Sequence, residues 1–222
     1  MRPKVLAFDV NETLLDLRAL DAPFQTVFGD AVLRPVWFQT MLQLSFVGGL
    51  TGAYVDFTSA QYAAIQMVAA RIGRTLTTQE ADSIVTAMKR LPPHIDTIPA
   101  LTRLREAGFI QVALANSPLD VVSAQIEFAG LVSLFDDLIS ADEVKQLKPA
   151  AAPYRLVAGR LGVPIEDVCL VAAHSWDVSG ALAAGAQAAF VARPGMVPSP
   201  LGPRPNFLGA DLSAIADALL AE

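Results

Sequence analysis

The segment from Val5 to Asp9 most constrains what this chain can fold into, because an apolar run ends there in a carboxylate. Four successive apolar residues, Val5 to Phe8, predict a short strand that is buried on both faces. Core packing gives no reason to place Asp9 directly after such a strand. The carboxyl ends of parallel strands open onto the crevice in which α/β proteins bind ligands. Asp9 is therefore predicted to lie in an active site.

From about residue 98 onward, helix patterns alternate with strand patterns. The expected helices cover residues 99–107, 118–129, 151–161, 178–184 and 213–220, and the expected strands cover residues 110–114, 137–140, 168–172 and 188–192. This alternation predicts a parallel, doubly wound sheet with right-handed crossovers.

The block between the first strand and this alternating region carries no convincing strand pattern. Apolar residues recur there at helical spacing over residues 32–46, 61–72 and 77–88. The predicted fold class is therefore α/β, a doubly wound parallel sheet with an inserted helical cap. The expected domains are a core of residues 1–15 and 94–222 and a cap of residues 16–93.

Composition narrows the functional classes. Of the 222 residues, 53% are hydrophobic and 17% are charged, which is typical of an ordered globular protein. The formal net charge of −6 argues against a nucleic-acid partner. No run of roughly 18 apolar residues predicts a membrane span, and the first residues lack a signal-peptide pattern. We therefore expect a cytoplasmic protein. Cys169 lies in an apolar run and is expected to be buried in a strand. The proline-rich residues 193–205 are expected to form an extended surface loop.

Polar residues follow four of the expected strands, and these are the candidates for chemistry. The groups are Asp9 to Thr13, Asn116 with Ser117, Lys148 before Pro149 and a helix, and His174 to Asp177. Thr13 can either cap the turn that follows it or donate a hydrogen bond to Asp9. Asn116 can likewise cap the next helix or serve the site.

These groups together resemble the motifs of the haloacid dehalogenase (HAD) superfamily, and the resemblance extends over essentially the whole chain. The phosphatases of that superfamily have a second Asp at the position of Asn11 and another acid at the position of Ala173. Mg²⁺ requires oxygen ligands, usually with carboxylates among them, so we expect neither a metal nor another cofactor. Asn116 and the pair Trp176-Asp177 are instead similar to the 2-haloacid dehalogenases.

The resemblance implies a hydrolase that releases halide from a short (S)-2-haloacid or a haloacetate. Asp9 would displace the halide and form an aspartyl ester, which water would then hydrolyse. Lys148 would keep Asp9 ionised, and Asp177 would position Lys148 or the water. The implied partners are the haloacid and the halide ion, and a homodimer is expected from the family.

The resemblance also implies a set of substrate-binding residues. They are Val10, Asn11, Phe38, Phe57, Asn116, Ser117, Tyr154 and Trp176. Two of them carry open questions. The family has an arginine where this chain has Phe38, which leaves the substrate carboxylate without its usual partner, and Tyr154 is equally explained by core packing.

Glu12 and His174 both depart from the family, which has Gly and Asn at these positions. Both follow strands whose loops border one crevice in a doubly wound sheet. We therefore predict that Glu12 orients His174 as the general base that activates the ester-cleaving water. The alternative is a structural His174 beside a solvated Glu12. The second histidine, His94, is interpreted as loop structure.

Two other functions stay open at this level. One is a HAD phosphatase that has kept Lys148 and Asp177, and the other is a binding protein without catalytic activity on the same scaffold. Retention of Asp9, Lys148 and Asp177 together disfavours the second.

Overall fold

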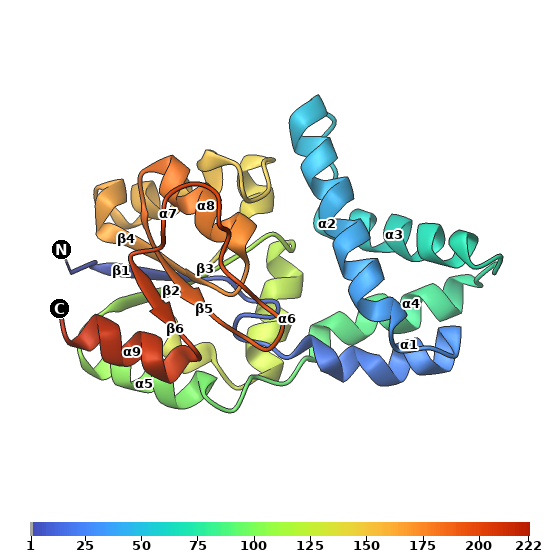
Figure 1. The fold of residues 1–222 in the computed structure, drawn as a ribbon, viewed down its shortest axis with the longest axis horizontal. Helices are drawn as coiled ribbons and strands as arrows, with labels where there is room; N and C mark the ends of the chain where they lie inside the picture. Colours follow the sequence, from blue (N-terminus) through green and yellow to red (C-terminus); the bar gives the residue numbers. More distant parts are fainter. Residues whose placement is uncertain (1) are drawn as a thin grey trace.

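The computed structural model describes residues 2–222 and shows a six-stranded, all-parallel sheet with helices on both faces (Figure 1). The strand order β3-β2-β1-β4-β5-β6 places β1 at the centre, so the chain builds first one half of the sheet and then the other. The strands are β1 (Val5–Phe8), β2 (Ile110–Ala115), β3 (Asp137–Ser140), β4 (Val168–Ala172), β5 (Gln187–Val191) and β6 (Phe207–Gly209). The predicted doubly wound α/β fold is confirmed.

The alternation of side chains along β1 divides the core into two layers. Leu6 and Phe8 pack on the face covered by helices α5, α6 and α9, whereas Val5 and Ala7 pack under α7 and α8. These helices are α5 (Thr97–Glu106), α6 (Leu119–Phe128), α7 (Ala151–Leu161), α8 (Ser175–Ala184) and α9 (Leu212–Leu220). Because both faces of the sheet are covered, β1 needs apolar residues at every position, as its sequence has.

Four further helices form a cap on one side of the sheet, at the right of Figure 1. They are α1 (Asp21–Phe28), α2 (Leu33–Thr51), α3 (Phe57–Arg71) and α4 (Thr78–Ala87). Trp37 of α2 is fully buried against α3 and donates its indole N–H to the carbonyl of Gln61 at 3.1 Å. Thr77 and Glu80 form a capping box that begins α4. The division at residues 16 and 93 stays a prediction.

Short 3₁₀ turns connect several of these elements. They are η1 (Leu17–Leu20), η2 (Met88–Arg90), η3 (Val132–Leu134), η4 (Ala141–Val144) and η5 (Ile165–Asp167). None of the helices in residues 2–222 combines the length and the apolar character that crossing a bilayer requires.

The structure corrects several of the expected elements, and α3 begins at Phe57 rather than at residue 61. Helix α1 was not expected, α2 extends to Thr51 rather than to residue 46, and α8 begins at Ser175 rather than at residue 178. Strand β6 lies just beyond the expected proline-rich loop and was also missed. Strand β6 is an edge strand that pairs only with β5. Its three residues are too few to show a period of two in the sequence.

Candidate active site

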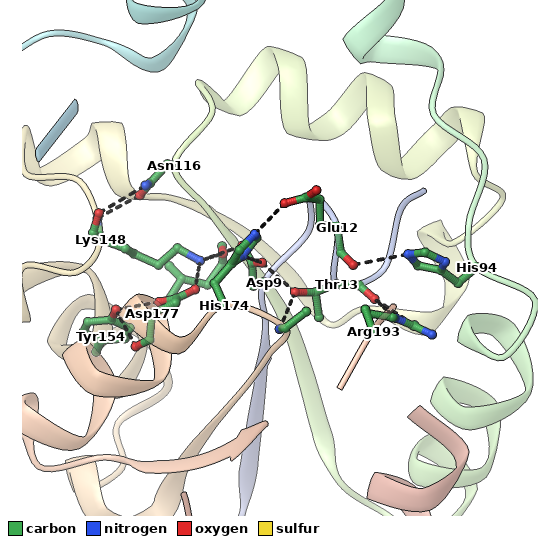
Figure 2. Close-up of polar contacts among 12 residues, drawn as sticks. Asp9, Glu12, Thr13, His94, Asn116, Lys148, Tyr154, His174, Asp177 and Arg193 are labelled. Atoms are coloured by element: carbon green, nitrogen blue, oxygen red, sulfur yellow. Dashed lines mark hydrogen bonds and ion pairs between the residues drawn. The ribbon is translucent and has the colours of Figure 1, made fainter. Parts of the chain in front are cut away.

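The four groups of polar residues predicted from the sequence meet at one edge of the sheet (Figure 2). Asp9 follows β1, Asn116 follows β2, and His174 follows β4 at the start of α8. Strands β2 and β4 are the two neighbours of β1, so their carboxyl ends open side by side. Lys148 lies in the loop before α7 and reaches the same place.

Asp9 is buried and receives three hydrogen bonds. The ammonium of Lys148 donates to Oδ1 at 2.9 Å, and the Thr13 hydroxyl donates to Oδ2 at 2.6 Å. His174 Nδ1 lies 3.1 Å from Oδ2. Burial alone would raise the pKa of Asp9, but the charge of Lys148 and the hydrogen bond from His174 outweigh it and hold the pKa well below its ordinary value. Asp9 is therefore an ionised carboxylate with only 8% of its side chain exposed.

Lys148 uses all three of its N–H groups within the protein. Besides Asp9, its ammonium donates to the carbonyl of Leu114 at 2.9 Å and to Asp177 Oδ2 at 2.6 Å. Burial would lower the pKa of Lys148, but the charges of Asp177 and Asp9 raise it. A cation with no donor left over acts on Asp9 through its charge and position rather than by binding a ligand itself.

Asp177 is held by two donors on opposite oxygens. Lys148 donates to Oδ2, and the hydroxyl of Tyr154 donates to Oδ1 at 2.6 Å. Burial raises the pKa of Asp177, and the hydrogen bonds from Lys148 and Tyr154 counteract it. The structure thus gives Tyr154 a polar role in this array in addition to its place in the core.

Asn116 fixes the backbone of the Lys148 loop. Its Oδ1 accepts from the backbone N–H of Lys148 at 2.8 Å, and its Nδ2 donates to the carbonyl of the same residue at 3.2 Å. The alternative of a helix cap is wrong, because α6 has Pro118 at its N-cap and no side chain bonds there. The paired bonds from Asn116 position the ammonium of Lys148 under Asp9.

His174 bridges Asp9 and Glu12. Its Nε2 lies 2.8 Å from Glu12 Oε2, and its Nδ1 faces Asp9 on the other side (Figure 2). The ring also lies between those of Phe38 and Trp176, with centroid distances of 6.0 and 5.1 Å. The predicted contact between Glu12 and His174 is therefore present.

The protonation state of His174 corrects the simple prediction of a base. Burial would lower the pKa of His174, but hydrogen bonds to Asp9 and Glu12, together with their charges, raise it to about 9. Both ring nitrogens face carboxylate oxygens, so both must donate. In the resting protein His174 is an imidazolium and has no free lone pair to accept a proton.

Glu12 has a left-handed backbone, with φ of 62°. That conformation is uncommon for residues other than glycine and is concentrated at functional sites. The backbone N–H of Glu12 donates to the carbonyl of Leu15 at 3.0 Å, which holds the turn. The strained turn aims the carboxylate of Glu12 at His174.

The structure also places four other residues that were predicted for the site. Thr13 belongs to the array, because its hydroxyl donates to Asp9 and accepts from the backbone N–H of Ala173 at 2.9 Å. The side-chain oxygen of Asn11 accepts from Gln125 Nε2 at 3.0 Å. Val10 and Phe57 are buried in the apolar core, the latter at the start of cap helix α3.

Three residues that were not assigned to the site from the sequence hold the loop that carries Glu12 and Thr13. Arg193 donates two hydrogen bonds to the carbonyl of Thr13, at 2.8 and 3.1 Å, and it pairs with Asp96 at 2.8 Å. His94 lies in a loop, as expected, and its Nε2 contacts the carbonyl of Glu12 at 3.2 Å. Burial, followed by the charge of Arg193, lowers the pKa of His94. Nothing in the sequence pattern signals these contacts, because they join residues about 80 to 180 positions apart.

The same geometry bears on metal binding. In residues 2–222 no three His, Cys, Asp or Glu side chains are grouped so as to hold a metal ion. The ammonium of Lys148 lies between the carboxylates of Asp9 and Asp177. A cation between these two acids would therefore face a fixed positive charge.

Comparisons with known proteins agree on one family. The family model described as haloacid dehalogenase-like hydrolase matches residues 3–185. The chain is 28% identical to (S)-2-haloacid dehalogenase H-109 of Pseudomonas putida over 97% of both chains. It is also 28% identical to haloacetate dehalogenase H-2 of a Moraxella species over 96% of both chains. The structure of L-2-haloacid dehalogenase from Xanthobacter autotrophicus superposes with a TM-score of 0.92 at 26% identity, over 98% of both chains. The chain therefore belongs to the haloacid dehalogenase-like hydrolase family.

Proposed function

We propose that the protein is a hydrolase of carbon–halogen bonds that converts a 2-haloacid to the 2-hydroxy acid. One observation carries the proposal. The ionised, nearly buried carboxylate of Asp9 lies against the His174–Glu12 pair and is held by Lys148. This array provides a nucleophile together with the means to release it afterwards.

The relatives support this choice of reaction. The curated proteins described above are named as dehalogenases of (S)-2-haloacids and of haloacetate. A second structure of the Xanthobacter autotrophicus L-2-haloacid dehalogenase, with chloropropionic acid covalently bound, superposes with a TM-score of 0.91 at 27% identity. A covalent adduct in that protein is consistent with nucleophilic catalysis by Asp9 in this chain.

In the first step a carboxylate oxygen of Asp9 attacks C2 of the acid. The new C–O bond forms as the C–X bond breaks, and the electron pair leaves with the halide. Lys148 keeps Asp9 ionised up to this point. The product is a neutral ester on Asp9.

The second step requires His174 to become a base, and formation of the ester provides the trigger. Two of the causes that raise the pKa of His174 are the hydrogen bond and the charge of Asp9. Esterification removes that charge, so the pKa of His174 falls and its Nδ1 proton, which no longer faces a carboxylate, is lost to solvent, while Nε2–H stays bonded to Glu12. Neutral His174 then accepts a proton from the water that attacks the carbonyl carbon of Asp9. As the tetrahedral intermediate collapses, His174 returns that proton to the leaving alkoxide oxygen, which releases the hydroxy acid. The regenerated carboxyl of Asp9 then gives its proton to His174, which restores the carboxylate and the imidazolium.

Within residues 2–222, two buried side-chain donors near the site have no hydrogen-bond partner in the protein. They are the hydroxyl of Ser117, directly after Asn116, and the indole N–H of Trp176, whose ring stacks on His174. A buried donor without a partner costs free energy unless a ligand satisfies it. We assign these two groups to the carboxylate of the substrate and to the leaving halide.

We further propose that the reaction needs no metal, because Lys148 already occupies the position between Asp9 and Asp177. We also propose a homodimer. Its support is the set of apolar side chains that α2 and α3 expose, namely Val36, Val47, Leu50 and Met67. The cytoplasmic location stays a prediction.

A single-turnover reaction tests the mechanism. Excess enzyme is mixed with (S)-2-chloropropionate in H₂¹⁸O containing EDTA, and chloride, lactate and the peptide carrying Asp9 are analysed. The expected result is chloride release, lactate without ¹⁸O, and ¹⁸O in the side chain of Asp9. Chloride release that stops in EDTA, or ¹⁸O in the first lactate formed, would contradict it. Mg²⁺-dependent release of phosphate from a phosphomonoester would favour the phosphatase.

The His174→Gln variant tests the proposed base in the same reaction. The ester should still form, because Asp9 and Lys148 are unchanged, and it should persist long enough to be detected as a mass increase on the Asp9 peptide. An unaltered rate of ester hydrolysis would refute the role of His174.

A further inference from the structure

The mechanism leaves unused a cavity of about 820 Å³ beside the active site. One wall is the end of cap helix α2 and the loop that follows it, and the other is the loop of residues 145–150 in the core. Phe46, Leu50, Val55, Leu147, Pro149 and Trp176 contribute its apolar surface. The cavity is thus formed jointly by the cap and the core.

Two residues of the cavity wall also contact the catalytic array. Lys148 belongs to the cavity wall, and its ammonium bonds to Asp9. Trp176 also lines the cavity, and its ring lies 5.1 Å from that of His174 on one side and 5.3 Å from that of Phe46 on the other. The cavity therefore adjoins the catalytic array at Lys148 and Trp176.

The charges in the cavity wall are already neutralised. Lys148 is paired with Asp9 and Asp177, and the exposed Lys145 is paired with Asp142 at 2.8 Å. Asp142 also accepts a hydrogen bond from Tyr54. A wall that is apolar apart from these paired groups favours an uncharged, apolar occupant.

Gly48 and Gly49 both line the cavity on the cap side, but their surroundings differ. A Cβ built on the nearby Gly48 would lie 2.8 Å from the carbonyl oxygen of Ala53, so packing alone explains that glycine. A Cβ on Gly49 would meet no atom within 4 Å. A larger side chain at Gly49 would therefore extend into open space at the cavity wall.

We propose that this cavity receives a large apolar substituent on C2 of the substrate, of the size of a butyl or benzyl group. The inference rests on the proposed function and changes its expected substrate from a short haloacid to a bulky one. Cavities of roughly 300–1,000 Å³ are the size that encloses drug-sized ligands, so a methyl group would leave most of this one empty.

The test compares kcat/KM for chloroacetate, (S)-2-chloropropionate, (S)-2-chlorohexanoate and (S)-2-chloro-3-phenylpropionate. For the unmodified protein the last two should exceed 2-chloropropionate by roughly tenfold or more, the scale that apolar pocket contacts provide. Gly49→Leu and Ala150→Leu fill the cavity from opposite walls. Each should lower kcat/KM for the two bulky acids by about tenfold and change that for chloroacetate less than twofold. Gly159→Leu is the matched control, because Gly159 lies on α7 outside the cavity with open space around it.

The outcomes separate the two proposals. If chloroacetate and 2-chloropropionate are dehalogenated but the bulky acids are not, or if the filling variants affect all four acids equally, the cavity assignment is overturned while the proposed reaction stands. If none of the four acids releases chloride, the proposed reaction fails and the cavity assignment fails with it.

Discussion

Glu12 and His174 form, with Asp9, the chain of contacts on which the chemistry of this site depends. The left-handed turn at Glu12 brings its carboxylate within 2.8 Å of His174, and His174 in turn reaches Asp9. The positive φ of Glu12 is a conformation in which glycine is free of strain. A glutamate in this conformation is an uncommon choice, for which the contact with His174 supplies a reason.

The Glu12→Gln variant should separate the two chemical steps. Glutamine can still accept a hydrogen bond from His174 but has no charge to stabilise the imidazolium that forms when His174 takes a proton from water, so release of the ester should slow by roughly 10²-fold, the lower range for general acid–base catalysis. Formation of the ester should change little. Rapid-quench measurement of the chloride burst and of lactate release distinguishes the steps. Equal slowing of both would show that Glu12 acts only on the shape of the site.

The pKa of His174 predicts how stability depends on pH. The folded-state pKa is raised to about 9 from an ordinary value of 6.5, so the stabilising contribution is complete below pH 6.5 and is lost as pH rises through 9. The loss should be on the order of 2 to 3 kcal/mol of unfolding free energy. Urea unfolding between pH 6 and 10 measures it. The His174→Gln variant should lack this decline, and an identical decline in both proteins would contradict the assignment.

At the scale of elements, the junction of helix α8 with the loop before α7 sets the positions of Asp177 and Lys148. Gly180 of α8 touches this loop so closely that a Cβ would lie 2.6 Å from Pro149 Cβ and 2.6 Å from the hydroxyl of Tyr154. Asp177 lies on the same helix, less than one turn earlier. The contact at Gly180 therefore fixes the spacing of the Lys148–Asp177 ion pair.

Gly180→Ala should push α8 away from this loop. We expect a loss of 1–3 kcal/mol in stability, which is typical of overpacking, and a loss of tenfold or more in kcat because the ion pair beneath Asp9 is displaced. Gly159→Ala on the exposed side of α7 is the control, since its Cβ meets open space and should stabilise the helix by up to about 1 kcal/mol. Denaturation curves and steady-state chloride release measure both. Full activity in Gly180→Ala would show that the spacing tolerates the shift.

At the scale of the whole molecule, Asp96 and Arg193 join three distant parts of the chain. Asp96 accepts from Arg193 and from the backbone N–H of Leu212 at the start of α9, and Arg193 donates to the carbonyl of Thr13 in the active-site loop. Asp96 directly precedes α5 and Arg193 follows β5, so this buried pair connects the start of α5, the active-site loop and the C-terminal helix.

Asp96→Asn should destabilise the protein by about 3–5 kcal/mol, because it leaves the buried guanidinium of Arg193 without its counter-charge. Asp217→Asn is the matched control. Asp217 pairs with Arg103 at the surface, with 67% and 44% of the two side chains exposed. Its loss should cost no more than about 1 kcal/mol. Equilibrium unfolding in urea compares the two, and equal effects would contradict the proposed structural role of Asp96.

The pattern of residues along the chain predicted the sheet, the helical cap and most of the residues that the structure brings together around Asp9. Apolar runs such as Val5 to Phe8 have a period that can be read locally, and polar residues after parallel strands must share one edge of the sheet. Helix α1 and strand β6 escaped because a short element has too few residues to show a period.

The folded structure sets how the residues of the site act. It places His174 between two carboxylates, so that His174 is an imidazolium at rest. It gives every N–H of the Lys148 ammonium an acceptor within the protein. It also opened the cavity beside Trp176. Protonation, hydrogen-bond saturation and cavity volume depend on atoms brought together from distant parts of the chain, so no local pattern encodes them.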